Sequence, residues 1–144
     1  MGYRLNIKQQ KGLSLIEIMV AITILTVAFV GMVQAFPFGL SISKEAADST
    51  VASYLCQSKL EEVVSLGYDN ITIGTIEARH RLSDDPTNYL YFYERETTTA
   101  YVDGDLNEVG SDQGMKKISS TVYYINAIYK NENSYNITTL ISQR

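Results

Sequence analysis

The chain has 144 residues and a formal net charge of −4, with 12 Lys and Arg against 16 Asp and Glu. This acidic balance does not favour a nucleic-acid-binding surface, which needs an excess of positive charge. The only cysteine, Cys56, excludes an internal disulfide, and the only histidine, His80, has no partner at metal-ligand spacing and is expected in a solvated loop. The sequence contains no nucleophile, phosphate-loop or CxxC motif, so we expect neither an enzyme nor a cofactor.

A long apolar run dominates the N-terminal part of the chain. From Leu13 to Val33 the only ionisable side chain is Glu17. These residues would form a helix of roughly 31 Å, which matches the ~30 Å hydrocarbon core of a bilayer. The basic residues Arg4, Lys8 and Lys11 precede the run without any acid, which predicts a cytoplasmic N-terminus.

Three interpretations of this N-terminus compete. A secretory signal peptide has support from Val33-Gln34-Ala35, which has small or apolar residues where signal peptidase reads, but the apolar run is far longer than a signal peptide core. An uncleaved signal anchor fits the length but leaves Glu17 without a role, although an ionisable residue in a membrane segment is costly and usually functional. The third interpretation comes from the residues around Gly12.

The run Lys11-Gly-Leu-Ser-Leu-Ile-Glu17 resembles the prepilin cleavage motif of type IV pilins and type II secretion pseudopilins. The resemblance implies that a prepilin peptidase cuts the basic leader, residues 1–12, after Gly12. It also implies N-methylation of the new terminus, Leu13, where the family most often has Phe. Glu17 then occupies the fifth mature position, where the family has a glutamate.

The resemblance implies a structural subunit, a minor pilin or pseudopilin, of a type IV pilus or type II secretion filament. Such a subunit sits in the inner membrane with its C-terminal domain in the periplasm or outside the cell, and enters a cell-surface filament after assembly. Its implied partners are the prepilin peptidase and N-methyltransferase, other pilin or pseudopilin subunits, an inner-membrane assembly platform and membrane lipid. The alternative function is a single-pass membrane-anchored β-domain that binds a ligand or partner without filament assembly.

Two roles for Glu17 remain open at this point. The resemblance implies that its carboxylate pairs with the α-amino group of a neighbouring subunit and sets the register of assembly. An unpaired amine in apolar surroundings would cost several kcal/mol, so such a pairing has a physical reason. Alternatively, the carboxylate stabilises its own helix, because negative charge is favoured near a helix N-terminus.

A second helical segment follows the membrane-length one. Pro37 is expected to kink or loosen the helix, so we predict a transmembrane or filament-core helix over residues 13–40 and an amphipathic helix over 41–67. Gly67 is a suitable terminating residue. Apolar residues at three- and four-residue spacing are expected to form the core face of this second segment: Ala47, Val51, Ala52, Leu55, Cys56, Leu60 and Val63.

The remaining residues, 68–144, predict a small β-sheet domain. Three runs are rich in β-branched and aromatic residues: Tyr89–Tyr93, Ile118–Tyr129 and Tyr135–Ser142. Lys130–Ser134 is expected to form a turn between two antiparallel strands, and Asp103–Gly114 a long loop. The predicted fold is therefore α+β, with a long N-terminal helix packed against an antiparallel sheet of three or four strands.

The loop contains a weak metal-site candidate. Asp103, Asp105 and Asn107 stand at alternate positions, as in a calcium loop. However, Glu108 occupies the position that requires glycine, and Gly114 occupies that of the closing acid. We therefore predict no metal site there, and no calcium binding tighter than about millimolar.

Overall fold

The structure is a computed structural model that describes residues 14–126 and 130–143. The cleavage-site residues Gly12 and Leu13 lie outside the described residues. The chain divides into two compact units, Met1–Gly39 and Leu40–Arg144, and we call the second unit the head domain. One long helix followed by an antiparallel sheet makes the fold α+β, as the sequence predicted.

The helix α1 (Leu15–Ser65) is one continuous element of 51 residues. Pro37 lies inside it and does not end it, so the two expected helical segments form a single helix. A proline removes one backbone hydrogen bond, here to the carbonyl of Val33, and the helix continues on both sides of it. The predicted C-terminus is confirmed, because Gly67 has a φ of 78° and its amide donates to the Val64 carbonyl at 3.1 Å.

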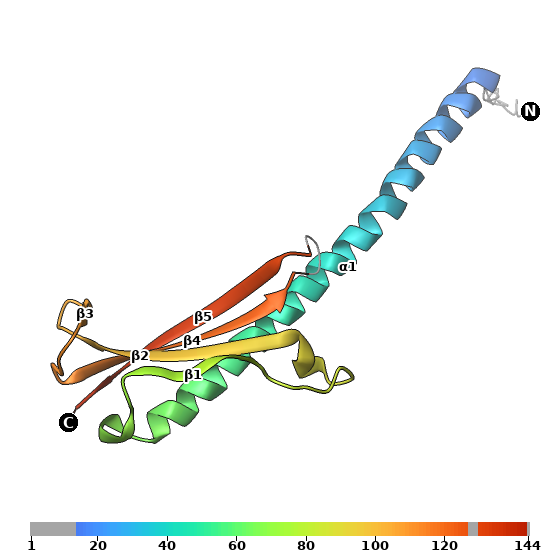
Figure 1. The fold of residues 1–144 in the computed structure, drawn as a ribbon. Helices are drawn as coiled ribbons and strands as arrows, with labels where there is room; N and C mark the ends of the chain where they lie inside the picture. Colours follow the sequence, from blue (N-terminus) through green and yellow to red (C-terminus); the bar gives the residue numbers. More distant parts are fainter. Residues whose placement is uncertain (1–13, 127–129, 144) are drawn as a thin grey trace, which may run out of the picture. The chain divides into compact units, whose positions relative to one another are not determined.

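The sheet consists of four long strands and one short one. Its order is β1-β2-β4-β5, all neighbours are antiparallel, and β3 pairs with β2 beside this path. Within the head domain the sheet lies along the C-terminal part of α1 (Figure 1). The strands are β1 (Gly74–Arg81), β2 (Tyr93–Val102), β3 (Glu108–Val109), β4 (Met115–Ile125) and β5 (Glu132–Ser142).

Two apolar clusters hold the sheet on the helix. In one, Ala52 and Cys56 of α1 meet Tyr93, Val122 and Tyr124 of β2 and β4, with Val51 and Leu55 half-buried beside them. In the other, Leu60 and Val63 of α1 meet Ile71 and Ile118. The predicted core face of the helix is thus confirmed, except that Ala47 is exposed. That position lies before the point where the buried stripe of α1 begins, at Ala52.

The predicted strand at Tyr89–Tyr93 is wrong for four of its five residues. Tyr89–Phe92 forms the short 3₁₀-helix η2, and only Tyr93 belongs to β2. The cause is local: the Asn88 side chain accepts a hydrogen bond from the Leu90 amide at 2.9 Å and so caps the helical turn. A second 3₁₀-helix, η1 (Tyr68–Asn70), follows α1.

The hairpin between the last two strands is confirmed, but its turn is displaced. The strand β4 ends at Ile125, and residues 127–129 of the predicted strand lie outside the described residues. The strand β5 begins at Glu132 rather than Tyr135, so it takes three residues from the predicted turn at Lys130–Ser134. The Asn126 amide donates to the Asn131 carbonyl at 2.8 Å. The predicted loop Asp103–Gly114 is confirmed, apart from the two residues of β3 within it.

Candidate functional site

The first part of α1 presents an apolar surface without any cover. Every residue from Ser14 to Leu40 is exposed in the structure. An 18-residue stretch of α1 has a mean hydropathy of 2.4, and none of its residues is buried. By length and composition the helix can cross a membrane.

The hydroxyl groups inside this apolar stretch are satisfied by the helix itself. Thr23 Oγ1 donates to the Met19 carbonyl and Thr26 Oγ1 to the Ile22 carbonyl, both at 2.8 Å. Such bonds to the residue four positions earlier remove the cost of placing a hydroxyl in hydrocarbon. Glu17 is the one ionisable side chain between Ser14 and Leu40, and an ionised carboxylate cannot donate such a bond.

Glu17 belongs to a helix cap that the sequence analysis missed. Its amide donates to the Ser14 carbonyl at 3.0 Å and lies 3.3 Å from Ser14 Oγ, so Ser14 occupies the N-cap position and Glu17 the third helical position. The pattern Ser-x-x-Glu before an apolar run is the capping-box signal, and it could have been read from the sequence. Glu17 also lies in the first turn of α1, where the helix dipole favours a carboxylate.

The cap leaves the charge of Glu17 without a cationic partner. Among the described residues, no Lys, Arg or His side chain forms an ion pair with it. The pairing of Glu17 with another subunit stays a prediction.

Residues 7–33 match the family model of the prokaryotic N-terminal methylation motif. The chain carries the type IV pilin and pseudopilin signature. This range includes Gly12, Leu13 and Glu17, the residues on which the resemblance was based. A search of curated proteins and a search of solved structures each gave no match. Together with the apolar helix, the signature fits a pilin-like subunit anchored in a membrane, and pilin-like proteins are structural.

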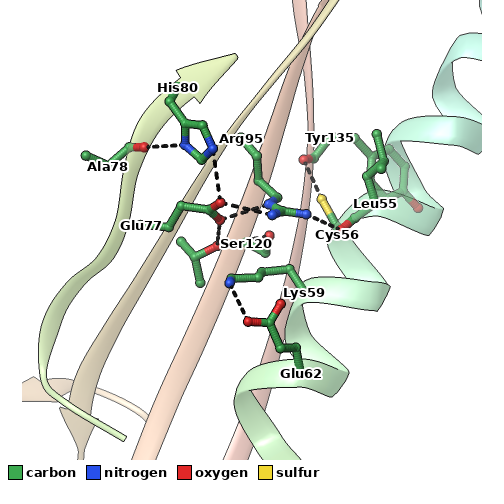
Figure 2. A network of polar contacts seen from close by, with 11 residues as sticks. Leu55, Cys56, Lys59, Glu62, Glu77, Ala78, His80, Arg95, Ser120 and Tyr135 are labelled. Carbon is green, nitrogen blue, oxygen red and sulfur yellow. Dashed lines mark hydrogen bonds and ion pairs between the residues drawn. The ribbon is translucent and has the colours of Figure 1, made fainter. Parts of the chain in front are cut away.

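In the head domain, a polar cluster joins β1 and β2 to α1 (Figure 2). Arg95 Nε and Nη2 donate to the two carboxylate oxygens of Glu77 at 2.8 and 2.9 Å, and Nη1 donates to the Leu55 carbonyl at 3.4 Å. Thr97 Oγ1 donates to the same carboxylate at 3.1 Å. The Glu77 and Arg95 side chains are only 13% and 15% exposed, so the two-pronged pair is shielded from water.

The ionisation of this cluster is typical of a structural contact. Burial opposes the charge on Glu77, but the hydrogen bonds and the charge of Arg95 outweigh it, so the pKa of Glu77 is lowered. Burial raises the pKa of Cys56, whose Sγ donates to the Tyr135 carbonyl at 3.4 Å, so the thiol is unreactive. His80 is exposed as predicted, but it lies on β1 rather than in a loop, 3.5 Å from Glu77.

A buried lysine was also missed. Lys116 on β4 donates from Nζ to the carbonyls of Tyr68 and Ile71 at 2.7 and 2.9 Å, and it lies over the Tyr68 ring at 4.2 Å. The Tyr68 hydroxyl donates to Asp112, and burial together with this acceptor raises the pKa of Tyr68 to about 12. These contacts hold the segment after α1 against the sheet and offer no open coordination site.

In the calcium-site candidate, the Asp103 side chain forms hydrogen bonds within its own loop. One Asp103 oxygen accepts from the amides of Asp105 and Asn107, both at 2.9 Å, and these bonds lower the pKa of Asp103. Over residues 14–126 and 130–143, no group of three or more His, Cys, Asp or Glu side chains is arranged to hold a metal ion. The expectation of at most millimolar affinity stays a prediction.

Proposed function

We propose that this chain is a minor pilin or pseudopilin, a structural subunit that is inserted in the inner membrane and assembles into a type IV pilus or type II secretion filament. The observation that carries the proposal is the methylation motif at residues 7–33, together with the first part of α1, where every described residue up to Leu40 is exposed. Apolar surface in water costs about 25 cal/mol per Å². The helix therefore needs lipid before assembly and the helices of other subunits after it.

The chemistry of processing explains the order of residues at the junction. The leader, residues 1–12, stays in the cytoplasm, and the peptidase cuts after Gly12, where a missing side chain lets the backbone enter a narrow cleft. The new terminus, Leu13, is then methylated, and residues 13–40 form the membrane and filament-core segment. The assembly platform draws this segment out of the membrane while Glu17 pairs with the α-amino group of a neighbouring subunit.

The intact mass of the membrane-extracted chain tests the processing step. We expect a chain that begins at Leu13 and carries one added methyl group, whereas Gly12→Val should leave the full-length precursor. Gly31→Val is the matched control, because a Cβ at Gly31 meets nothing within 4 Å, and it should be processed normally. A mature chain that begins at Phe36 would establish a signal peptide and overturn the proposal.

Mechanical shearing of cells tests the assembly step separately. Filaments released by shear should contain the processed chain together with other subunits. The alternative function, a single anchored β-domain that works without assembly, requires processed chain in the membrane and none in the sheared fraction. That result would retain the membrane anchor and reject the filament.

A further inference from the structure

An aromatic cavity opens at the end of the head domain that is nearest to the start of its helix. The cavity has a volume of about 360 Å³. Its apolar lining includes Tyr89, Phe92 and Ile125, which are 64%, 62% and 53% exposed, and Lys44 and Lys130 also line it. We call these five residues the aromatic patch. None of the three exposed apolar residues belongs to the core clusters.

Side-chain hydrogen bonds fix the position of the patch along α1. The Tyr93 hydroxyl donates to Asp48 at 3.1 Å, and the Tyr124 hydroxyl donates to Glu45 at 3.3 Å. Asn133 Nδ2 donates to the same Glu45 carboxylate at 2.9 Å. This end of the sheet is therefore held beside residues 45–48, about 8–12 Å along the helix from Leu40 at 1.5 Å per residue.

The uncovered apolar side chains of α1 continue to the edge of the patch. Leu40 and Ile42 are exposed and lie within one turn of Lys44. Leu40 and Ile42 need apolar surroundings, as the membrane-length run before them does. A membrane that reaches Ile42 brings Lys44, two residues later on the same helix, to the headgroup layer.

The composition of the patch suits a phospholipid surface. Aromatic side chains with one apolar and one polar end collect at the interface between lipid and water, and lysines extend toward lipid phosphates. Acids near the patch would repel an anionic surface, but each has a partner. Glu45 and Asp48 accept the hydrogen bonds that hold the sheet. Glu94 and Glu132, which line a neighbouring cavity with Phe92 and Ile125, both pair with Arg79. The two lysines therefore supply the charge that faces the headgroups.

We propose that the aromatic patch docks the head domain on the headgroups of the outer leaflet of the inner membrane while the subunit is unassembled. This inference rests on the proposed function, because it requires α1 to span that membrane. Docking sets the depth of the helix and holds the head domain against the lipid surface. Filament entry then requires the patch to leave the lipid.

The absence of tryptophan from the chain makes the inference testable with single reporters. Phe92→Trp is reconstituted as the full-length chain in vesicles of phosphatidylethanolamine and phosphatidylglycerol, some with bromine near the headgroup and some with bromine deep in the acyl chains. We expect its emission to shift to shorter wavelength and to be lost more strongly with the shallow bromine.

Two matched reporters separate the inference from the proposed function. Phe29→Trp lies in the apolar part of α1 and should be quenched by the deep bromine; if it is not, the membrane insertion itself is wrong. Leu66→Trp lies at the other end of the head domain's helix, about 39 Å of helix from Leu40, and should not be quenched. Quenched Phe29→Trp with unquenched Phe92→Trp overturns the docking inference alone.

Two further outcomes decide the chemistry of the contact. Replacing Lys44 and Lys130 by Gln in the Phe92→Trp chain should reduce quenching in anionic vesicles and leave it unchanged in purely zwitterionic ones. An emission shift that needs no bromine contact and grows with the protein-to-lipid ratio would mean that a second copy covers the patch. That result would overturn docking on lipid.

Discussion

The two parts of α1 share one backbone but have opposite surroundings. Up to Gly39 its apolar side chains point in all directions and every one is exposed. From Ala52 onward, Ala52, Cys56, Leu60 and Val63 form a stripe that the sheet buries, while charged residues such as Glu61 and Glu62 lie outside the stripe. A helix that is apolar all round needs surroundings that are apolar all round, whereas an amphipathic helix needs a partner on one side.

This contrast predicts different roles for the two parts of α1. The head domain supplies its own apolar partner and can fold around residues 40–65 of α1. The first part has backbone and hydroxyl bonds satisfied within the helix, and it must find lipid or other subunits to cover its side chains. Substitutions in the first part should therefore change membrane insertion or assembly, and substitutions in the second should change the stability of the fold.

We expect the largest effect from a substitution of Glu17, the only charged residue in the first part of α1. Glu17→Gln keeps a capping residue at the third helical position, since Gln also serves in a capping box, and removes only the charge. A neighbour's α-amino group left unpaired in an apolar environment costs ~3–5 kcal/mol. We expect normal processing and membrane insertion, and a large loss of the chain from sheared filaments.

Ser14→Ala is the control for the capping role. It removes the N-cap hydroxyl at a cost of about 1 kcal/mol and keeps the charge of Glu17. Filament recovery should fall much less than in Glu17→Gln. If Ser14→Ala lowers recovery as much as Glu17→Gln does, the glutamate acts as a cap and not as the docking contact.

A cavity-forming substitution in the second part of α1 tests whether the sheet and this part of the helix stabilise each other. Leu60 is buried against Val63, Ile71 and Ile118, so Leu60→Ala should cost ~2–5 kcal/mol. Thermal unfolding of the full chain in detergent, followed by tyrosine near-UV circular dichroism, measures the loss. Val27→Ala shortens an exposed side chain in the first part and should leave this transition unchanged; an equal shift would mean that the two parts fold as one.

A charge in the first part tests its dependence on lipid. Ile24→Lys lies near the middle of the apolar run and should cost ~2.5–3.5 kcal/mol on insertion. Alkaline extraction of membranes should release this variant. Tyr54→Lys places the same charge at an exposed position of the second part, and that variant should stay in the membrane pellet. Release of both variants would show that extraction reports misfolding and not loss of the span.

The contrast between the two parts of α1 was readable from the sequence. Apolar periodicity gave the helix and the buried residues Ala52, Cys56, Leu60 and Val63. The motif at Gly12 and Glu17 gave the family signature, which covers residues 7–33. Both signals are local in sequence, and neither depends on which distant residues meet.

The strand β1 was not readable, for physical reasons. Its sequence, GTIEARHR, has only two apolar side chains at alternate positions, Ile76 and Ala78, which is too short a pattern to predict a strand. Its pairing with β2 also shifts register twice, between Thr75 and Glu77 and between Glu77 and His80. Its two half-buried residues are Ile76, which packs on the core, and Glu77, whose burial depends on Arg95, 18 positions later. A buried ion pair between strands has no periodic signal, because each partner alone resembles a surface residue.

The smallest expected effect comes from this pair, and acid titration measures it. The pKa of Glu77 is lowered on folding, so the unfolded chain binds the proton more readily than the folded one. The pair therefore stabilises the head domain above the unfolded glutamate pKa of about 4.3, and this stabilisation is lost as the pH falls through the lower folded value.

Glu77→Gln keeps the size of the side chain and removes the titration. At pH 6 the variant should be less stable by about 2 kcal/mol, the scale of hydrogen bonds to a charged group, because Arg95 keeps its charge without a carboxylate. From pH 6 to pH 3 the melting temperature of the wild type should fall further than that of the variant, so the two values converge. Other carboxylates with lowered pKa, such as Asp85 and Asp112, contribute equally to both chains and cancel. Parallel curves over this range would mean that the pair is solvated and that β1 is held by its backbone bonds alone.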